Sequence, residues 1–522
     1  MTKAGAPSTR ELRREDHGGR AWGMTSIGAL VALVTLLPLG FVVGYTIEIG
    51  WDQASALVFR PRVGELLGNT ARLAVGAMVA CAVLGVAAAW LTERTNVPGR
   101  RVLSVLLVAP LAIPAFVNSY AWVSLVPSAT GYGGALLIVT LSYFPFVYLP
   151  VAAALRGLDP ALEETAQTLG HGAVRAFVRC TLPQLRPAIL GGCLLVGLHL
   201  LAEFGALQML RFPTFTTAIY DQYQSTFSGP AANMLASVLV LCCLVLLVAE
   251  LGLRGRTRYA RTGSGAARVM VRTRLGAFAA PAWVLLTVLV LLAVGVPVAS
   301  LAYWMATGSS ADFDIGLLAD TTATSLRLGL VGATVTTAAA IPIAWLSIRR
   351  RGWLSTATER ATYISSALPG IVVALALVTI VIRVLPDLYQ TTSVLIAAYA
   401  MLFIPRAMVS LRASLAQAPP VLEDVAAALG HNRVGVLRRV TLPLIAPGLG
   451  AGAALVFLAV VTELTATLLL APTGTVTLAT QFWSHSSSVA YAAAAPYATI
   501  MVLISAPATY LLTRQLNREA SS

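Results

Sequence analysis

The sequence predicts an all-α polytopic membrane protein. Of its 522 residues, 57% are hydrophobic and only 11% are charged, and the mean hydropathy is +0.79. A soluble domain has about a quarter of its residues charged. The apolar residues form runs of roughly 20, the length that a helix needs to cross the hydrocarbon core. These runs fall into two similar sets of six, so we expect about 12 transmembrane helices in two parallel six-helix repeats.

The expected organisation is a cytoplasmic tail at 1–22, a first half at 23–253, a basic cytoplasmic linker at 254–279 and a second half at 280–522. The predicted spans of the first half are Thr25–Ile47, Leu73–Leu91, Val102–Val126, Gly131–Leu155, Ala188–Leu210 and Ala231–Val248. Those of the second half are Pro281–Met305, Leu328–Ile348, Ala361–Ile382, Thr391–Val409, Gly448–Leu470 and Ala492–Leu512.

The net charge of +14 marks membrane topology. Lys3 is the single lysine, and most arginines lie in a few short loops that alternate with the spans. With the N-terminus inside, 30 of the 36 basic residues fall on the cytoplasmic side, as the positive-inside rule requires. We therefore expect both termini in the cytoplasm and the protein in the cytoplasmic (inner) membrane. A nucleic-acid partner is not expected, because such proteins gather basic residues on one folded face.

The two halves repeat in register. Ala89-Trp90-Leu91 matches Ala344-Trp345-Leu346 at a spacing of 255 (344 − 89), and Pro114 matches Pro369 at the same spacing. Further along, the spacing becomes 260, as between Glu203 and Glu463 (463 − 203). An even number of spans separates the copies, so both halves have the same orientation. A pathway is expected where the two halves meet.

Two polar segments, which we call islands, lie between apolar runs of the sequence at the 260 spacing (423 − 163): Glu163–Pro187 and Glu423–Pro447. Each predicts helix, turn, helix, with Gly170 or Gly430 as the left-handed residue that ends the first helix. They could be amphipathic connectors on the membrane surface. The repetition of glutamate, glycine and proline in register favours docking of a partner instead.

The islands resemble the EAA loops of permease subunits in binding-protein-dependent ABC importers of the type I fold. Glu-Glu-x-Ala-x-x-Leu-Gly followed by Thr-Leu-Pro carries the resemblance, which covers nearly the whole chain as two fused halves. Thr165 and Val425 stand where alanine is usual. The resemblance places EAA loops at 158–187 and 418–447 and implies the following ATPase-docking residues: Glu163, Glu164, Ala166, Gly170, Glu423, Asp424, Ala426 and Gly430.

The chain is not expected to be an enzyme or to bind a cofactor. A phosphate-binding loop G-x-x-x-x-G-K-[ST] needs a lysine, and Lys3 lies in the polar tail. The resemblance implies that ATP is bound and hydrolysed by two copies of a separate ABC ATPase, and that an extracytoplasmic substrate-binding protein delivers the cargo. The remaining expected partner is the lipid bilayer.

Four residues are candidates for the pathway. Glu203 and Glu463 are acids at equivalent places inside spans, where a carboxylate indicates either a pathway or a structural hydrogen bond. Asn118 and Tyr120 follow the Pro114 break and could line the channel or join neighbouring helices. The five cysteines lack the spacing of a metal or disulfide site, so no metal site is certain.

The cargo is the most open question. The segments Glu203-Phe204-Gly205-Ala206 and Glu463-Leu464-Thr465-Ala466 resemble the ferric-iron branch of these permeases, although Thr465 and Ala471 depart from its usual proline and arginine. We therefore favour ferric iron, with thiamine or a polyamine as alternatives carried by the same machinery. A self-sufficient secondary transporter with a parallel repeat is the alternative from a different class.

Overall fold

The computed structural model describes residues 24–158, 165–166, 168–224, 229–254, 273–308, 314–349 and 352–519. The predicted tail, most of the basic linker, Glu163 and Glu164 lie outside these ranges. The described residues form helices, with one isolated β-bridge between Thr95 and Thr273. Eight of the helices are long and apolar enough to cross a membrane, and counting each of four bent pairs as one span gives twelve. The predicted all-α, multi-pass fold is confirmed.

Matched prolines break the third span of each half. Arg100–Ala112 and Ala115–Leu125 meet at 93° around Pro114, and Trp353–Ser365 and Gly370–Val384 meet at 101° around Pro369. Both prolines have extended backbone, with ψ of 142° and 145°, and stand at the N-cap of the second helix. Proline has no N–H to continue a helix, and it suits a helix start. The same proline therefore causes the same bend in both halves.

The described chain divides into two compact units. Unit 1 comprises residues 1–44 and 324–475, and unit 2 comprises 45–323 and 476–522. Two helices, α2 (Leu37–Ile49) and α17 (Ile315–Arg349), run through a unit boundary. Unit 1 also contains the helix Met24–Thr35, α18 (Trp353–Ser366), α19 (Gly370–Val384), η6 (Pro386–Leu388), α20 (Thr392–Gln417), α21 (Pro420–Ala428), α22 (Arg433–Val436), η7 (Leu437–Thr441), α23 (Leu442–Val461) and α24 (Thr465–Leu470).

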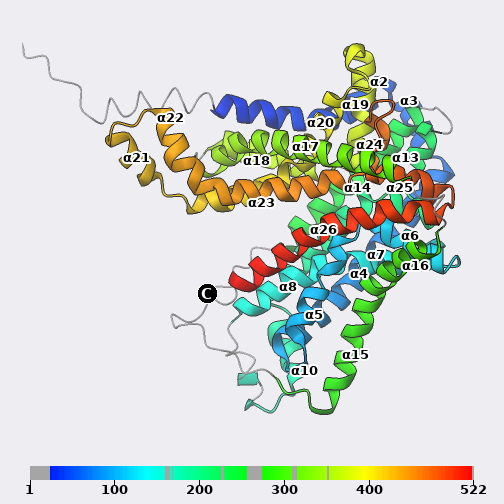
Figure 1. Cartoon of the computed structure of the whole chain (residues 1–522), viewed down its shortest axis with the longest axis vertical. Coiled ribbons are helices and arrows are strands. Elements are labelled where there is room, and N and C mark those ends of the chain that lie inside the picture. Colours follow the sequence, from blue (N-terminus) through cyan, green and yellow to red (C-terminus); the bar gives the residue numbers. More distant parts are fainter. Residues whose placement is uncertain are drawn as a thin grey trace, which may run out of the picture. The chain divides into compact units, whose positions relative to one another are not determined.

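Unit 2 holds most of the first half together with both ends of the second (Figure 1). Its helices are α3 (Trp51–Val58), α4 (Pro61–Arg94), α5 (Arg100–Leu106), η1 (Ala109–Ala112), α6 (Ala115–Leu125), α7 (Gly131–Tyr143), α8 (Pro145–Gly157), α10 (Ala173–Ala176), η2 (Phe177–Thr181), α11 (Arg186–Ala202), α12 (Gly205–Met209), α13 (Phe215–Gln224), α14 (Gly229–Arg254), η3 (Gly276–Phe278), α15 (Ala279–Val290), η4 (Leu291–Gly295), α16 (Val296–Thr307), α25 (Leu478–Ser487) and α26 (Tyr491–Glu519).

The units cross the halves predicted from the sequence repeat. In unit 1 the first span of the first half packs on second-half helices, where Ser365 Oγ donates to the Thr35 carbonyl at 2.9 Å. In unit 2, α16 from the second half packs on α6 from the first half, with Ser124 and Ser300 Oγ 3.0 Å apart. The compact units therefore differ from the sequence repeat. The first span of each half packs in the unit that the other half mainly forms.

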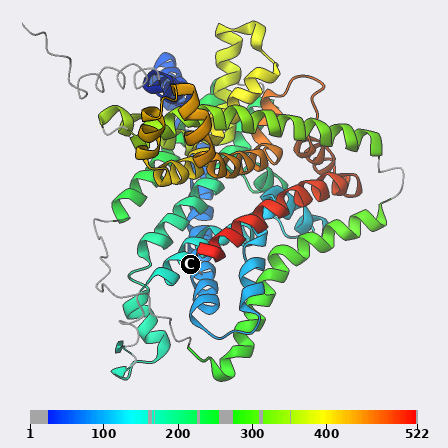
Figure 2. The same ribbon diagram turned by 60° about the vertical axis from the view of Figure 1, so that its left-hand side comes forward.

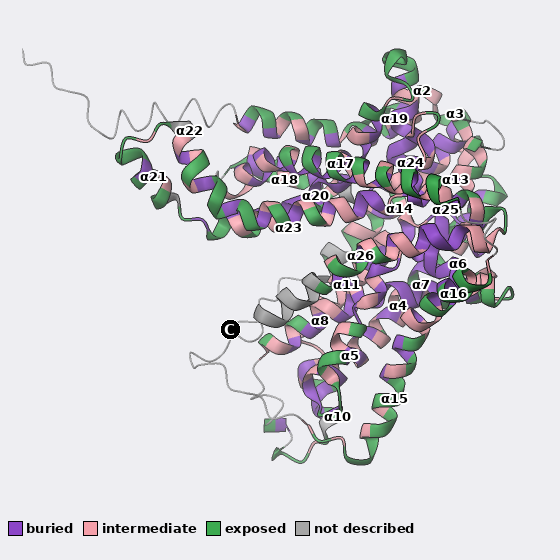
Figure 3. Cartoon of the chain, viewed as in Figure 1, coloured by how far each residue is buried: buried purple, intermediate pink, exposed green. Residues whose placement is uncertain are grey.

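Close helix packing in unit 2 depends on two glycines. A Cβ added at Gly85 of α4 would lie 2.9 Å from the Val147 Cβ, and one at Gly192 of α11 would lie 2.8 Å from the Val147 Cα. Small residues let backbones approach closely inside a membrane, so α4 and α11 both pack tightly on α8. Figure 3 shows the contrast between mostly buried helices such as α6 and mostly exposed ones such as α21.

Candidate coupling surface and pathway residues

The second island forms a helix, a tight turn and a second helix. α21 ends at Ala428, and Gly430 then takes the left-handed conformation with φ of +86°. Across the turn the backbone N–H of His431 donates to the Ala426 carbonyl at 3.2 Å, and that of Gly430 donates to Ala427 at 3.1 Å. The predicted glycine terminator is confirmed here, because only glycine adopts this φ without strain.

The described part of the first island repeats this turn. Gly170 has φ of +87°, and the N–H of His171 donates to the Ala166 carbonyl at 3.1 Å. Each island then enters a π-helical turn at equivalent positions, η2 (Phe177–Thr181) and η7 (Leu437–Thr441). The two islands therefore share one backbone design in both compact units.

An ion pair anchors the second island to its unit. The Glu423 carboxylate accepts a hydrogen bond from Thr441 Oγ1 at 3.1 Å and lies 3.5 Å from the Arg349 guanidinium. Arg349 also donates to the Ala418 carbonyl at 2.9 Å. Glu423 thus holds α21 to η7 and to the end of α17. Sequence reasoning missed Arg349, although the 255 register pairs it with the buried Arg94 (349 − 94).

The opposite side of α21 presents apolar side chains. Val421, Val425 and Leu429 are 64%, 49% and 75% exposed, whereas Ala426 is buried. In the first island Leu169 and Val174 are similarly exposed, and Ala166 is buried. Figures 1 and 2 both place α21 and α22 at the end of α23 remote from α24. The paired alanines Ala166 and Ala426 are therefore buried, and the exposed apolar residues form what we call the island face.

Glu203 caps a short helix at a break in its span. Its Oε1 accepts the N–H of Ala206 at 2.9 Å, and its Oε2 accepts the Tyr143 hydroxyl at 2.5 Å. The backbone carbonyl of Glu203 accepts from Thr216 Oγ1 at 2.7 Å. These contacts match the structural alternative for Glu203, and its role in a pathway stays a prediction.

Glu463 repeats the cap but not its surroundings. Its Oε1 accepts the N–H of Ala466 at 3.0 Å, as in the first half. Here the charged neighbour is Arg406, which interacts electrostatically with Glu463. The 260 register places Phe146 opposite Arg406 (406 − 146). The equivalent acids therefore sit in different electrostatic environments.

Asn118 and Tyr120 are buried in unit 2 and join helices. Asn118 Nδ2 donates to Ser142 Oγ of α7 at 2.8 Å, and the Tyr120 hydroxyl donates to the Tyr491 carbonyl of α26 at 2.6 Å. Both contacts are the interhelical hydrogen bonds that the sequence left as the alternative to channel lining. Among the described residues, no group of three or more His, Cys, Asp or Glu side chains could hold a metal ion.

A duplicated, multi-span helical fold with a matched pair of polar turns is what a membrane transport permease is expected to show. The family described as "Binding-protein-dependent transport system inner membrane component" matches residues 82–258 and 336–518, one match in each half. The chain belongs to this family, the inner-membrane permeases of ABC importers. Membership decides against the self-sufficient secondary transporter that the sequence had left open.

Individual relatives of the chain are permeases for several cargoes. The chain is 39% identical over 494 residues to the "Fe(3+)-transport system permease protein FbpB 2" of Haemophilus influenzae, covering 94% of this chain and 98% of that protein. It is 31% identical over 238 residues to the Escherichia coli "Sulfate transport system permease protein CysT", covering 42% and 86%. It is 30% identical over 190 residues to the Escherichia coli "Molybdenum transport system permease protein ModB", covering 32% and 82%. The iron-transport permease is matched over both halves, and the sulfate-transport and molybdenum-transport permeases over a shorter part.

Proposed function

We propose that this permease imports ferric iron delivered by an extracytoplasmic binding protein. The single observation that carries the proposal is the full-length similarity to an Fe(3+)-transport permease, which spans 94% of this chain and 98% of the relative. The segments that begin at Glu203 and Glu463 support it, because their sequences resemble the ferric-iron branch of these permeases.

The energy comes from two copies of an ABC ATPase, one at each island. The islands offer equivalent turns with apolar faces, so two identical subunits can bind in the same way. With both islands in the cytoplasm, both termini lie there too, in agreement with the arginine distribution. ATP binding draws the ATPases together, the islands transmit this motion to their helices, and hydrolysis resets them.

Transport of labelled cargo by the reconstituted complex tests the proposal. The permease and its ATPase are placed in proteoliposomes, and the binding protein is added loaded with radiolabelled ferric iron, thiamine or a polyamine. We expect ATP-dependent uptake of iron and iron-dependent stimulation of ATPase activity. Stimulation by thiamine-loaded or polyamine-loaded protein without uptake of iron would show that this compound, and not iron, is the cargo. The permease assignment would be unaffected.

A further inference from the structure

A cavity lies in unit 2 where the spans α4 and α14 begin. It has a volume of about 150 Å³ and is lined by residues from α3, α4, α13, α14 and the turn before α4. A water molecule occupies about 30 Å³ in the liquid, so the cavity has room for a small polar headgroup. Its position differs from that of the islands and from the Glu203 and Glu463 caps.

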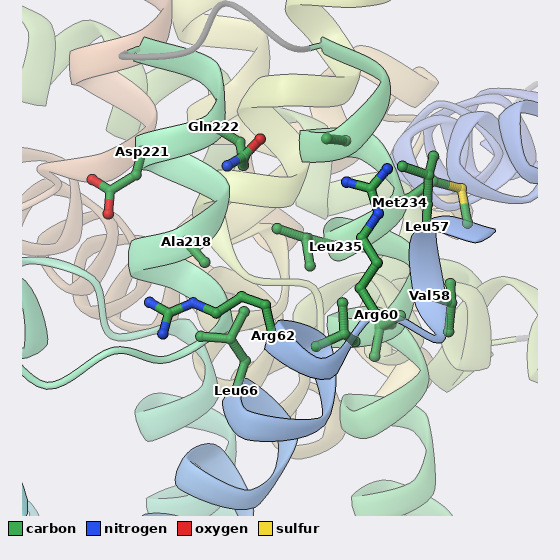
Figure 4. Close-up of a pocket in the computed structure, with 13 residues that line it drawn as sticks. Leu57, Val58, Arg60, Arg62, Leu66, Ala218, Asp221, Gln222, Met234 and Leu235 are labelled. Carbon is green, nitrogen blue, oxygen red and sulfur yellow. The ribbon is translucent and has the colours of Figure 1, made fainter. Parts of the chain in front are cut away.

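Three charged side chains surround this cavity. Figure 4 shows the guanidinium of Arg62 on the same side as the Asp221 carboxylate, with that of Arg60 on the other side. Arg60 Nε donates to the Ala56 carbonyl at 3.2 Å, which fixes the side chain beside the cavity. Arg62 is also paired with Glu65 at 2.7 Å. The cavity therefore offers a positive group and a negative group to one ligand.

The rest of the lining is apolar and continues into the membrane spans. Leu66 of α4 and Met234 of α14 are buried in the wall, and Leu235 and Val238 follow along α14. Trp51, at the start of α3, and Phe59, between the lining residues Val58 and Arg60 in the sequence, are 77% and 76% exposed. Exposed aromatic residues at the ends of spans are typical of the lipid–water interface. An apolar wall that runs down from a charged rim suits an amphiphile.

We propose that this cavity binds the headgroup of a zwitterionic phospholipid, with its phosphate at Arg60 and its ammonium at Asp221. The acyl chains then follow the apolar wall of α4 and α14. Desolvation raises the pKa of the Asp221 carboxyl, and Gln208 and Arg62 offset this only in part. Because Arg62 and Gln208 offset only part of the desolvation, a bound ammonium stabilises the charged form of Asp221 further. Arginine suits the phosphate because it donates hydrogen bonds in a planar fork.

Native mass spectrometry of the delipidated full chain tests the site. Phosphatidylethanolamine and phosphatidylglycerol are titrated against the wild type, and bound lipids are counted. We expect Arg60→Gln to weaken both lipids roughly tenfold, the loss of one charged hydrogen-bond partner. Asp221→Asn is expected to remove the preference for the ethanolamine lipid while leaving phosphatidylglycerol binding unchanged. Arg383→Gln, at an exposed arginine on α19, is the matched control.

Two further arms separate the lipid from other ligands. Ala218→Phe fills the cavity without altering its charges and is expected to lower lipid binding as strongly as Arg60→Gln. Inorganic phosphate and glycerophosphoethanolamine, which lack acyl chains, are expected not to compete at millimolar concentration. Competition by inorganic phosphate overturns the proposal in favour of a soluble phosphate. Unchanged lipid binding with lost stimulation by the binding protein overturns it in favour of a protein partner.

Discussion

Individual side chains show how the same acid can serve differently in the two halves. Glu203 and Glu463 both cap a short helix through Oε1. Beyond the cap, Glu203 accepts a hydrogen bond from the neutral Tyr143, whereas Glu463 interacts electrostatically with the charged Arg406. Equivalent substitutions should therefore have unequal effects, and this difference separates structural from transport roles.

Glu203→Gln is expected to keep iron uptake within about twofold of wild type. The glutamine oxygen still accepts from the Ala206 N–H, and the glutamine NH2 can donate to the Tyr143 hydroxyl, so the cap of α12 persists. Glu463→Gln is expected to reduce both uptake and melting temperature, because it leaves Arg406 without its counter-charge in a membrane. Uptake in proteoliposomes and Tm in detergent measure the two effects. A large loss of uptake in Glu203→Gln at unchanged Tm would show instead that this carboxylate acts on the cargo.

The Arg349–Glu423 pair should control how firmly the ATPase binds. Both side chains are largely shielded, at 12% and 24% exposure, so we expect Arg349→Gln and Glu423→Gln each to weaken ATPase binding roughly fivefold, or about 1 kcal/mol. The double variant is expected to be no weaker than either single one, since both remove the same contact. Binding of the purified ATPase to each variant completes the cycle, with Arg383→Gln as control. Additive losses would mean that the two residues act separately.

At the scale of elements, the islands owe their shape to local sequence. The turn depends on backbone conformation alone, because a Cβ at Gly170 or Gly430 would meet nothing within 4 Å. This is why the sequence predicts it correctly. The ion pair below it joins residues 74 positions apart (423 − 349), which no local pattern reveals. Only the repeat register, through Arg94 and Arg349, carries a signal for it.

Gly430→Ala is expected to impair coupling without any steric clash. An L-residue at φ of +86° is strained by roughly 1–2 kcal/mol, so the turn relaxes and the island face shifts. We expect lower ATPase co-purification and lower uptake, and the same for Gly170→Ala. Gly450→Ala in α23, where a Cβ also meets nothing within 4 Å, is the matched control, expected to leave both unchanged. Equal behaviour of all three variants would show that the island turns do not couple the permease to the ATPase.

The whole molecule holds the largest feature that sequence reasoning did not anticipate. Hydropathy locates each span because every span must be apolar, but it does not say which spans are neighbours. The predicted twelve segments each correspond to an apolar helix or bent pair. Their grouping differs from the repeat, since α16 packs with first-half helices and Met24–Thr35 packs with second-half helices. Serine pairs such as Ser124 and Ser300 became visible only in three dimensions.

A disulfide between residues 124 and 300 should test this exchange directly. Their hydroxyl oxygens are 3.0 Å apart, so cysteines there need only a small shift to reach bonding distance. In a background without the native cysteines, Ser124→Cys with Ser300→Cys is expected to crosslink on oxidation. Cleavage at a protease site inserted in the linker 255–272 then leaves one band on a non-reducing gel and two after reduction.

The crosslink joins the two sequence halves but stays within unit 2, so oxidised protein is expected to keep its ATP-dependent uptake. The two single-cysteine variants control for the substitutions themselves. Failure to crosslink would show that α16 does not pack on α6 but on helices of its own sequence half. Efficient crosslinking with loss of uptake that reduction restores would show that α16 and α6 must separate during transport, against their grouping in one compact unit.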